Sequence, residues 1–281
     1  MMTNLLGIFG YPIRHTLSPV LHQAAFRALG LPYYYLPFEV APEKLKDAMA
    51  AVIALNMKGV NITRPHKETV IPYLYRLTKD AQKIGAVNTI EIVNGQPIGH
   101  NTDGAGFLQS LADEKIDPAG MRVILLGAGG AARAVAVALL TRKISRLVIV
   151  SRSAKRGHAL AKHLALLCRN KIEIKWHPFD AKKSFSDEMT LLINTTPLGM
   201  KKSDPLPYSP DLFHPTWIVA DLIYSPHKTA LLLAAEREGL KTVPGIGMLL
   251  HQGALSFEIW TKQKAPIEAM RNALQKTLYD N

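Results

Sequence analysis

Short apolar segments alternate along the chain with longer stretches in which apolar residues recur every three or four positions. The short segments predict buried strands, and the periodic stretches predict helices with one apolar face. The predicted strands are Leu5–Gly10, Tyr33–Glu39, Val60–Ile62, Arg122–Leu126, Leu147–Val150, Ile172–Trp176, Leu191–Asn194 and Ile218–Asp221. The predicted helices between them are Ser18–Leu29, Glu43–Leu55, Ala131–Thr141, Ala154–Leu167 and Thr229–Glu238. This alternation predicts an α/β fold in which helices cover largely parallel sheets.

Two local signals refine this outline. Ser18-Pro19 marks a helix start, because serine can cap a helix and proline suits its first position. Asn94-Gly95 stands between two short strand-like segments and predicts a hairpin, so the first sheet should be mixed.

Changes of pattern predict two domains. The first ends near Asn101–Gly106, and the chain returns to it near Pro244-Gly245, where two further helices follow over Met248–Thr261 and Pro266–Thr277. We therefore expect residues 1–101 and 245–281 to form one domain, residues 102–244 a second, and a cleft between them. The length of 281 residues agrees with this number, at about 150 residues per domain.

Composition excludes several classes of protein. Apolar residues make up 48% of the chain and charged residues 20%, which is typical of globular proteins. No apolar run approaches the ~20 residues needed to span a bilayer, and the N-terminus does not resemble a signal peptide, so we expect no membrane contact and no secretion. One cysteine, Cys168, cannot form an internal disulfide and fits a reducing, cytoplasmic setting.

The chain is strongly basic, with 34 Lys and Arg against 22 Asp and Glu, a net charge of +12. These basic residues are scattered rather than gathered in a stripe with aromatic residues, so we expect no nucleic-acid partner. The excess charge instead favours small anionic ligands. The ten histidines show neither H-E-x-x-H nor Cys/His pairing, so we expect no metal.

A glycine-rich segment follows the predicted strand Arg122–Leu126 and opens the next helix. It reads Gly127, Ala128, Gly129, Gly130, Ala131 and Ala132, the G-x-G-x-x-A pattern. The first glycine allows a tight turn, the second allows backbone to approach a pyrophosphate, and Ala132 allows close packing of helix on strand. The free N–H groups of the helix then face the phosphates, so the segment predicts dinucleotide binding.

The end of the next strand bears on the choice of dinucleotide. NAD enzymes usually place an acidic residue there to bind the ribose hydroxyls. This chain has Ser151, Arg152 and Ser153 instead, followed by Lys155 and Arg156. Since a guanidinium can bind a phosphate through two hydrogen bonds, the segment favours NADP(H) over NAD.

Four polar clusters stand where the strands of the first domain end. They are Thr16-Leu17-Ser18, Asn61 to Lys67, Asn88-Thr89, and Asn101-Thr102-Asp103. Each has an ordinary structural explanation, such as a helix cap, a turn or a solvated lysine. Open α/β sheets bind ligands beyond the carboxyl ends of their strands, and the joint occurrence of hydroxyls, amides, one lysine and one aspartate there predicts a polar ligand site.

The whole chain resembles the shikimate dehydrogenase family. The matching segments are GYPIRHTLSPVLHQAAF (10–26), GVNITRPHK (59–67), GAVNTI (85–90), GHNTDGAG (99–106), LGAGGAARA (126–134), NTTPLGM (194–200), DLIYSPHKTALL (221–232) and GIGMLLHQGALSFEIW (245–260). The resemblance implies an N-terminal substrate domain with a mixed sheet and a Rossmann-like NADP domain. It also implies reversible, NADPH-dependent reduction of 3-dehydroshikimate to shikimate in aromatic amino-acid biosynthesis. Some members prefer quinate or NAD.

The resemblance also implies roles for individual residues. In the substrate domain, Lys67 and Asp103 form the catalytic pair, Thr16 and Ser18 hold the substrate carboxylate, and Thr63, Asn88 and Gln252 bind ring substituents or carboxylate, with Tyr224 nearby. On the cofactor side, the expected residues are Gly127, Ala128, Gly129, Gly130 and Ala131 at the phosphates, Ser151, Arg152 and Ser153 at the 2′-phosphate, and Thr195, Leu222, Gly245 and Met248 at the nicotinamide and its ribose.

Two positions depart from the family pattern. Thr16-Leu17-Ser18 replaces the usual Ser-x-Ser, and Ser151-Arg152-Ser153 replaces the usual Asn-Arg-Thr. Several alternatives stay open at this point. The chain could prefer quinate, or bind NADP as a non-catalytic sensor, although a sensor would need neither Lys67 nor Asp103. Lys67 could act alone as the acid or in a relay with Asp103, and the protein could be a monomer or a homodimer.

Overall fold

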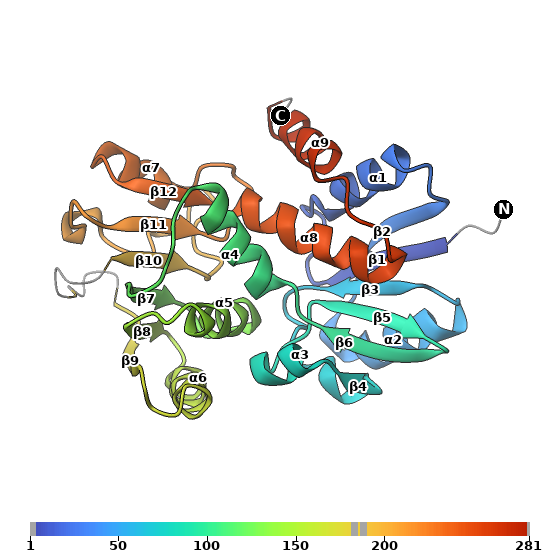
Figure 1. Ribbon diagram of the computed structural model, residues 1–281, viewed down its shortest axis with the longest axis horizontal. Coiled ribbons are helices and arrows are strands. Elements are labelled where there is room, and N and C mark those ends of the chain that lie inside the picture. Colours follow the sequence, from blue (N-terminus) through green and yellow to red (C-terminus); the bar gives the residue numbers. More distant parts are fainter. Residues whose placement is uncertain (1–3, 181–184, 186–189, 280–281) are drawn as a thin grey trace. The chain divides into compact units, whose positions relative to one another are not determined.

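The computed structural model describes residues 4–180, 185 and 190–279. Contacts divide the chain into two units, residues 1–106 with 249–281 (unit 1) and residues 107–248 (unit 2) (Figure 1). The divisions fall inside α4 (Asp103–Asp113) and α8 (Gly245–Thr261), a few residues beyond the boundaries that we expected at 101/102 and 244/245. One reason is that Gly106 packs so closely on Gln252 that a Cβ atom there would lie 2.6 Å from the Gln252 nitrogen.

Unit 1 contains a mixed sheet, as predicted. Its strand order is β2-β1-β3-β5-β6-β4, with β2–β1–β3 parallel, β3–β5–β6 antiparallel and β4 parallel to β6. The strands are β1 (Asn4–Gly10), β2 (Tyr33–Glu39), β3 (Gly59–Ile62), β4 (Arg76–Leu77), β5 (Thr89–Val93) and β6 (Gln96–His100). The predicted hairpin joins β5 to β6, and its turn residues Asn94 and Gly95 have φ values of 51° and 75°. Two successive positive φ values suit an Asn-Gly turn.

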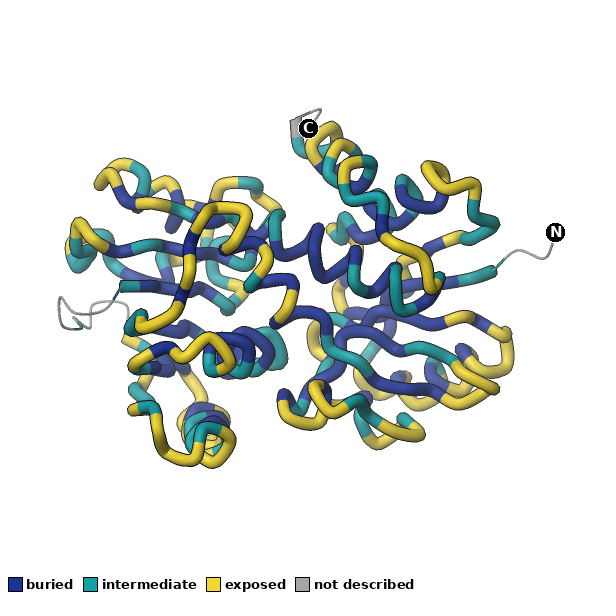
Figure 2. The backbone as a smooth tube through the Cα atoms, in the orientation of Figure 1, coloured by how far each residue is buried: buried dark blue, intermediate teal, exposed yellow. Residues whose placement is uncertain are grey.

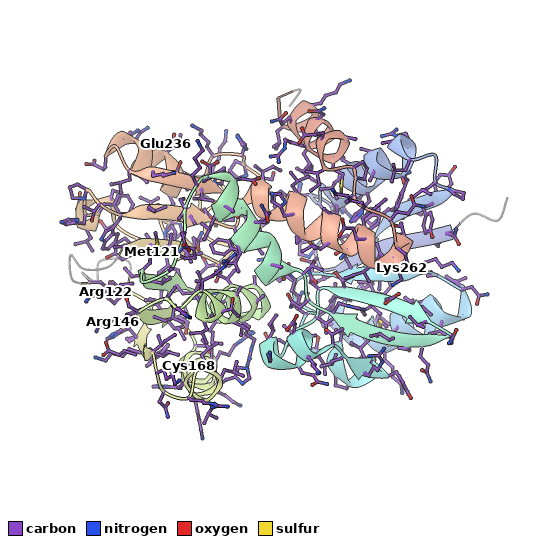
Figure 3. The ribbon with its side chains drawn as sticks, in the orientation of Figure 1. Met121, Arg122, Arg146, Cys168, Glu236 and Lys262 are labelled. Atoms are coloured by element: carbon purple, nitrogen blue, oxygen red, sulfur yellow. The ribbon has the colours of Figure 1, made fainter. Side chains whose placement is uncertain are left out.

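Helices cover both faces of this sheet. They are α1 (Ser18–Ala28), α2 (Leu45–Ala54), α3 (Lys79–Ile84), the unit 1 part of α8 and α9 (Ile267–Tyr279), with 3₁₀ turns η1 (Pro42–Lys44) and η2 (Ile71–Tyr73). α2 packs on one face through Leu45, Met49 and Val52. On the other face, Phe26 of α1 stacks on Phe257 of α8, with ring centres 5.4 Å apart. At the end of α8, Lys262 (labelled in Figure 3) pairs with Glu91 of β5 at 2.6 Å.

The start of α1 corrects one prediction. Ser18 is the first helical residue rather than the cap, which is Leu17 and makes no side-chain cap bond. Thr16 takes over part of that role, because its Oγ1 accepts a 3.3 Å hydrogen bond from the Ser18 backbone N–H. The Ser18 hydroxyl is thereby left free of a capping duty.

Unit 2 contains an all-parallel sheet with the order β12-β11-β10-β7-β8-β9. The strands are β7 (Arg122–Leu126), β8 (Arg146–Ser151), β9 (Glu173–Pro178), β10 (Leu191–Asn194), β11 (Ile218–Asp221) and β12 (Lys241–Pro244). The helices are α5 (Gly130–Thr141), α6 (Ala154–Leu167) and α7 (Ala230–Arg237), with most of α4, the first turn of α8 and the 3₁₀ turn η3 (Pro210–Leu212). This doubly wound arrangement is the Rossmann-like fold that was expected.

Alternate residues of the unit 2 strands point into two separate cores. Val123 and Leu125 of β7 pack with α4, α5 and α6, whereas Ile124 and Leu126 pack with α7. The four central strands, β7, β8, β10 and β11, are consequently buried on both faces, as the dark blue segments in Figure 2 show. Parallel strands covered on both faces are expected to read as continuous apolar runs, which is how RVILL reads. None of the described helices is long and apolar enough to cross a membrane.

Candidate functional site

The four polar clusters of unit 1 meet at one edge of its sheet. β1 and β3 are parallel neighbours, so the segments after Gly10 and Ile62 leave the sheet on the same side. β5 runs antiparallel to β3 and begins at that edge with Thr89, which pairs with both Asn61 and His100. Chain reversal through the hairpin returns the end of β6 to the same edge. The topology thus gathers residues 16–18, 63–67, 88–89 and 101–103.

Lys67 and Asp103 form a close ion pair at this edge. The distance from Lys67 Nζ to Asp103 Oδ2 is 2.6 Å, and the two side chains are 17% and 4% exposed. Such charge-assisted hydrogen bonds are short and strong when little water competes. The lysine side chain keeps a small exposed area, whereas the carboxylate side chain is almost completely buried.

The loop before Lys67 is fixed on both sides. The buried His66 ring donates from Nε2 to the Val40 carbonyl oxygen at 2.7 Å, which assigns the proton to Nε2, since a carbonyl can only accept. The Lys67 carbonyl in turn accepts from the Val87 N–H at 2.7 Å. The lysine is therefore presented by backbone that is tied to two neighbouring segments.

Asn88 links the ion pair to α8. Its Nδ2 donates to Asp103 Oδ1 at 2.9 Å, to Thr102 Oγ1 at 2.8 Å and to Gln252 Oε1 at 3.2 Å. Asn88 is 2% exposed, so its amide is committed to these protein groups. Gln252 holds the longest and weakest of the three bonds, which makes it the partner most easily exchanged for a ligand oxygen.

Three further hydroxyl-bearing residues stand in the segments that follow the strands of unit 1. Thr16 Oγ1 donates to Ser18 Oγ at 3.2 Å, so the Ser18 hydrogen is free to point elsewhere. Thr63 follows β3, and its methyl group is packed against Gly10, where a Cβ atom would lie 2.5 Å from Thr63 Cγ2. Unit 1 thereby brings together Thr16, Ser18, Thr63, Lys67, Asn88, Asp103 and Gln252 on the segments that the sequence singled out. Tyr224, in contrast, belongs to unit 2.

In unit 2, the glycine-rich turn has the geometry that a dinucleotide needs. Gly127 has a φ of +115°, and a Cβ atom there would lie 2.3 Å from Thr195 Oγ1, so only glycine fits. Gly129 precedes α5 with extended backbone, and the one atom near its Cβ position is Arg156 Nη2 at 3.9 Å. The space beside Gly129 and the uncapped N–H groups of α5 fit a pyrophosphate.

The segment after β8 combines an exposed arginine with two serines that are bonded within the protein. Arg152 is exposed, whereas Ser151 is buried and accepts from Trp176 Nε1 at 3.0 Å while it donates to the Ser153 carbonyl at 3.1 Å. Ser153 caps α6 by accepting from the Arg156 N–H at 3.3 Å. Both serine hydroxyls thus have structural partners. The sequence had not singled out Arg156 as a ligand, although its position in the first turn of α6, four residues after Arg152, was a signal.

The remaining cofactor candidates pack around the ends of the unit 2 strands. Thr195 donates to the Leu126 carbonyl at 2.6 Å. A Cβ atom at Gly245 would lie 2.4 Å from the Leu222 oxygen, so this glycine permits close contact between two loops. Met248 is 7% exposed and lies in the apolar core with Phe107.

Asp221, at the end of β11, ties two of these loops together. It accepts from the Thr229 hydroxyl at 2.8 Å, from the Ile223 N–H at 3.0 Å and from Asn194 Nδ2 at 3.1 Å. Burial raises the pKa of the Asp221 carboxyl to about 6, against the lowering effect of these three donors. The sequence pattern gave no sign of this role, because the partners come from separate segments.

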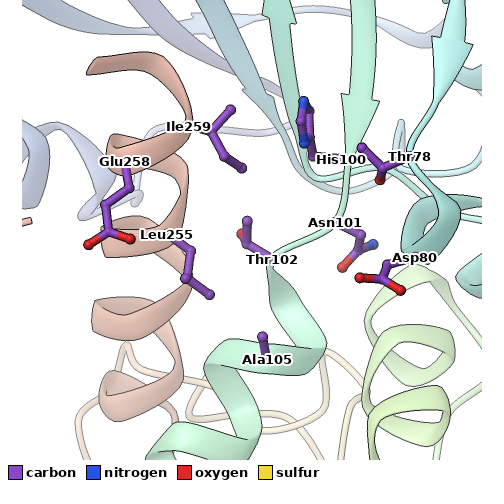
Figure 4. Close-up of a pocket in the computed structure, with 9 residues that line it drawn as sticks. All are labelled: Thr78, Asp80, His100, Asn101, Thr102, Ala105, Leu255, Glu258 and Ile259. Carbon is purple, nitrogen blue, oxygen red and sulfur yellow. The ribbon is translucent and has the colours of Figure 1, made fainter. Parts of the chain in front are cut away.

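A separate pocket of about 400 Å³ lies in unit 1 between α8 and the segment from β6 to α4 (Figure 4). Its polar lining includes Asp80, His100 and Glu258, and two lining residues, His100 and Thr102, also form hydrogen bonds with Asn88. Lys67 and Asp103 are not among the residues that line it. Across the described residues, no group of three or more His, Cys, Asp and Glu could hold a metal ion.

Comparisons with known proteins assign both units. The family model described as the shikimate dehydrogenase substrate binding domain matches residues 8–90. The models described as shikimate / quinate 5-dehydrogenase and as the shikimate 5′-dehydrogenase C-terminal domain match residues 110–196 and 245–275. A relative from Methanopyrus kandleri, named shikimate dehydrogenase (NADP(+)), is 42% identical, over 98% of this chain and 96% of its own. The chain belongs to the shikimate dehydrogenase family.

Solved structures agree with this membership. A crystal structure of a shikimate dehydrogenase in complex with NADP+ is 38% identical with a TM-score of 0.90, over 98% of this chain and 96% of its own. The ligand-free 5-ketofructose reductase of Gluconobacter sp. strain CHM43 is 33% identical with a TM-score of 0.87, over 99% of each chain. The fold of the shikimate dehydrogenase family therefore does not by itself fix the substrate.

Proposed function

We propose that this protein catalyses the reversible, NADPH-dependent reduction of 3-dehydroshikimate to shikimate, a step of aromatic amino-acid biosynthesis. The observation that carries the proposal is the buried Lys67–Asp103 pair, 2.6 Å apart, surrounded by hydroxyl and amide groups at one sheet edge. Family membership supports the choice of substrate and cofactor.

The chemistry assigned to the chain is a proton transfer coupled to hydride transfer. When bound, NADPH supplies the hydride to the ketone carbon. Lys67 Nζ gives a proton to the ketone oxygen as that oxygen gains charge. Asp103 holds the ammonium in place and accepts from a neighbouring ring hydroxyl. General acid catalysis of this kind typically contributes about 10²–10⁴-fold in rate.

Substrate recognition is assigned to the groups around the pair. Ser18 donates its free hydrogen to the substrate carboxylate, with Thr16 beside it as the second hydroxyl. Thr63 and Gln252 bind ring oxygens, and Asn88 Nδ2 binds a ligand oxygen in place of its weakest partner, Gln252 Oε1. Tyr224 is assigned to the carboxylate end on the family resemblance alone.

Cofactor recognition is assigned to unit 2. Gly127, Ala128, Gly129, Gly130 and Ala131 hold the pyrophosphate at the start of α5. Arg152 and Arg156 bind the 2′-phosphate. Ser151 and Ser153 position these two arginines, since their hydroxyls are already bonded within the loop. Thr195, Leu222, Gly245 and Met248 shape the nicotinamide side.

We also propose that the protein acts in the cytoplasm on small molecules rather than nucleic acid, as a monomer or homodimer. The scattered positive charge and the single cysteine, Cys168, support this setting.

The test is steady-state kinetics with purified protein. Shikimate and quinate are each oxidised with NADP+ and NAD+, and 5-ketofructose is offered for reduction with NADPH. We expect kcat/KM to be highest for shikimate with NADP+. A higher kcat/KM for quinate or for 5-ketofructose would show that this compound, and not shikimate, is the preferred substrate. NADPH binding without any turnover would identify a sensor instead of an enzyme.

A further inference from the structure

A chain of buried polar side chains lies behind Asn88 in unit 1, and the proposed substrate and cofactor roles do not use it. It consists of Tyr35, Asn61, Thr89 and Ser256, which are 1%, 4%, 0% and 0% exposed. Water therefore cannot satisfy their polar atoms, and each must find protein partners. The donor and acceptor roles of these partners fix the orientations of the Asn88 and Asn61 amides.

The orientation of the Asn88 amide is settled by a backbone group. The Thr102 N–H donates to Asn88 Oδ1 at 2.8 Å, and a peptide N–H cannot accept. The carbonyl oxygen of the Asn88 side chain must therefore face Thr102. Its NH₂ group is then the part that faces Asp103 Oδ1, at 2.9 Å.

The orientation of the Asn61 amide is likewise fixed by its partners. Its Nδ2 donates to the backbone carbonyl of Asn88 at 2.9 Å, and its Oδ1 accepts from the Tyr35 hydroxyl at 2.7 Å. The remaining Nδ2 hydrogen faces two hydroxyl oxygens, Thr89 Oγ1 at 3.0 Å and Ser256 Oγ at 3.2 Å. Thr89 Oγ1 can accept from Asn61 and still donate its own hydrogen.

Thr89 connects Asn61 to Asn88. Its hydroxyl donates to Asn88 Oδ1 at 2.9 Å, and Ser256 Oγ of α8 lies 2.7 Å from it. Hydrogen bonds thus connect Tyr35 through Asn61, Thr89 and Asn88 to the Asp103 carboxylate. Hydrogen bonds in such a row polarise one another in a dry interior.

We propose that the Thr89 hydroxyl is a positioning group for catalysis. It gives Asn88 Oδ1 a second donor, keeps the Asn88 NH₂ aimed at Asp103, and so holds the carboxylate against Lys67; Ser256 anchors it from α8. Without this donor, Asn88 Oδ1 would be held by the Thr102 N–H alone, and its NH₂ group would be aimed less firmly at Asp103. This inference rests on the proposed function and adds a residue that does not itself touch substrate.

The experiment compares Thr89→Val, which keeps the shape and removes the hydroxyl, with Thr89→Ser, which keeps the hydroxyl. For Thr89→Val we expect kcat for shikimate oxidation to fall about tenfold, with KM within about threefold, because the loss concerns the reacting groups. Thr89→Ser should restore kcat to within about twofold of wild type. Thr261→Val is the matched control, since it removes one half-buried hydroxyl of α8 that bonds only within its own helix and the turn after it.

The outcomes separate cleanly. A Thr89→Val protein with kcat within twofold of wild type overturns the inference. So does a loss that Thr261→Val shares, or one that Thr89→Ser fails to rescue. If Thr89→Val does not fold, Ser256→Ala is measured, with an expected loss in kcat of about threefold at unchanged KM, and normal kcat there also overturns it. An inactive wild-type protein would instead refute the proposed function.

Discussion

Lys67 is the residue on which the proposed chemistry depends most directly. Lys67→Ala removes the proton donor but leaves the hydroxyl groups that bind substrate, so kcat should fall by about 10²-fold or more while KM for shikimate changes much less. Lys67→Met keeps the length of the side chain without its charge and should behave in the same way. Steady-state kinetics of both variants measure this, and a near-native kcat in either would exclude Lys67 as the acid.

Thr16 departs from the family pattern, and its contact with Ser18 predicts how much that matters. Thr16→Ser keeps the hydroxyl that donates to Ser18 Oγ and should leave kcat/KM for shikimate within a few-fold of wild type. Thr16→Val keeps the shape and removes the hydroxyl assigned to the substrate carboxylate, so kcat/KM should fall roughly 10–100-fold, since hydrogen bonds to charged groups contribute about 1.5–3 kcal/mol. A loss below about threefold would show that Thr16 only shapes the turn before α1.

Arg152 should set the choice of cofactor. Arg152→Ala removes a cation that can bind the 2′-phosphate, so NADPH should bind roughly 10–100-fold more weakly. Binding of NADH should hardly change, because NADH lacks that phosphate. Titrations of both cofactors, followed by fluorescence, provide the comparison. Equal losses for the two would assign Arg152 a structural role.

At the scale of elements, Gly129 in the turn between β7 and α5 can be changed to test cofactor binding with little effect on protein stability. Gly129 has a φ of −93° and no atom closer than 3.9 Å to its Cβ position, so alanine fits the folded chain there. Its methyl group would nevertheless occupy the space assigned to the pyrophosphate. Gly129→Ala should therefore shift Tm by only a few degrees, the size of a changed helix cap, while Kd for NADPH rises at least about tenfold. Unchanged Kd would move the pyrophosphate away from this turn.

The elements also show what the sequence pattern could and could not predict. β7, β10, β11 and α6 match their predicted bounds, because the central strands are continuous apolar runs and α6 begins at a serine cap. β4 has only two residues, α3 barely exceeds one turn, and the edge strand β12 reads Lys-Thr-Val-Pro, so neither length nor apolar pattern marked them.

The candidate site was predictable as a set of residues but not as an arrangement. The positions of Lys67, Asn88 and Asp103 at strand ends predicted a polar site. Which atoms bond to which depends on the register that pairs Asn61 with Thr89 and Thr89 with His100, and such long-range pairing leaves no local signature. The same holds for Asp221, which bonds Asn194 of another strand, 27 residues away along the chain.

At the scale of the whole molecule, the two units should respond oppositely to mild acid. Burial lowers the pKa of His22 in unit 1 to about 3, so the unfolded state binds more protons below pH 6.5 and unit 1 loses stability as the pH falls from there. Burial raises the pKa of Asp221 in unit 2 to about 6, so the folded state gains the extra proton and unit 2 is stabilised as the pH falls below 6. Each effect is at most about 1.4 kcal/mol per pH unit.

Hydrogen exchange at pH 6.5 and pH 5 measures this, because that interval lies above the range in which surface carboxylates titrate. Protection should drop in unit 1 and hold or rise in unit 2. His22 is stacked on Tyr35 with ring centres 4.3 Å apart, and His22→Leu keeps an apolar contact there without a titrating ring. That variant should abolish the acid response of unit 1, and an unchanged response would assign it to other groups.

The order in which the ribosome releases this chain follows from the way unit 1 is divided. Unit 2 is continuous and complete once residue 248 has emerged, whereas unit 1 still lacks the rest of α8 and all of α9. Until then, Phe26 and Tyr35 have no Phe257 or Trp260 to pack against, and Asn88 has no Gln252. Nascent chains therefore carry an uncovered aromatic face on unit 1 for most of synthesis, and transiently exposed apolar surface of this kind favours aggregation until α8 has been released.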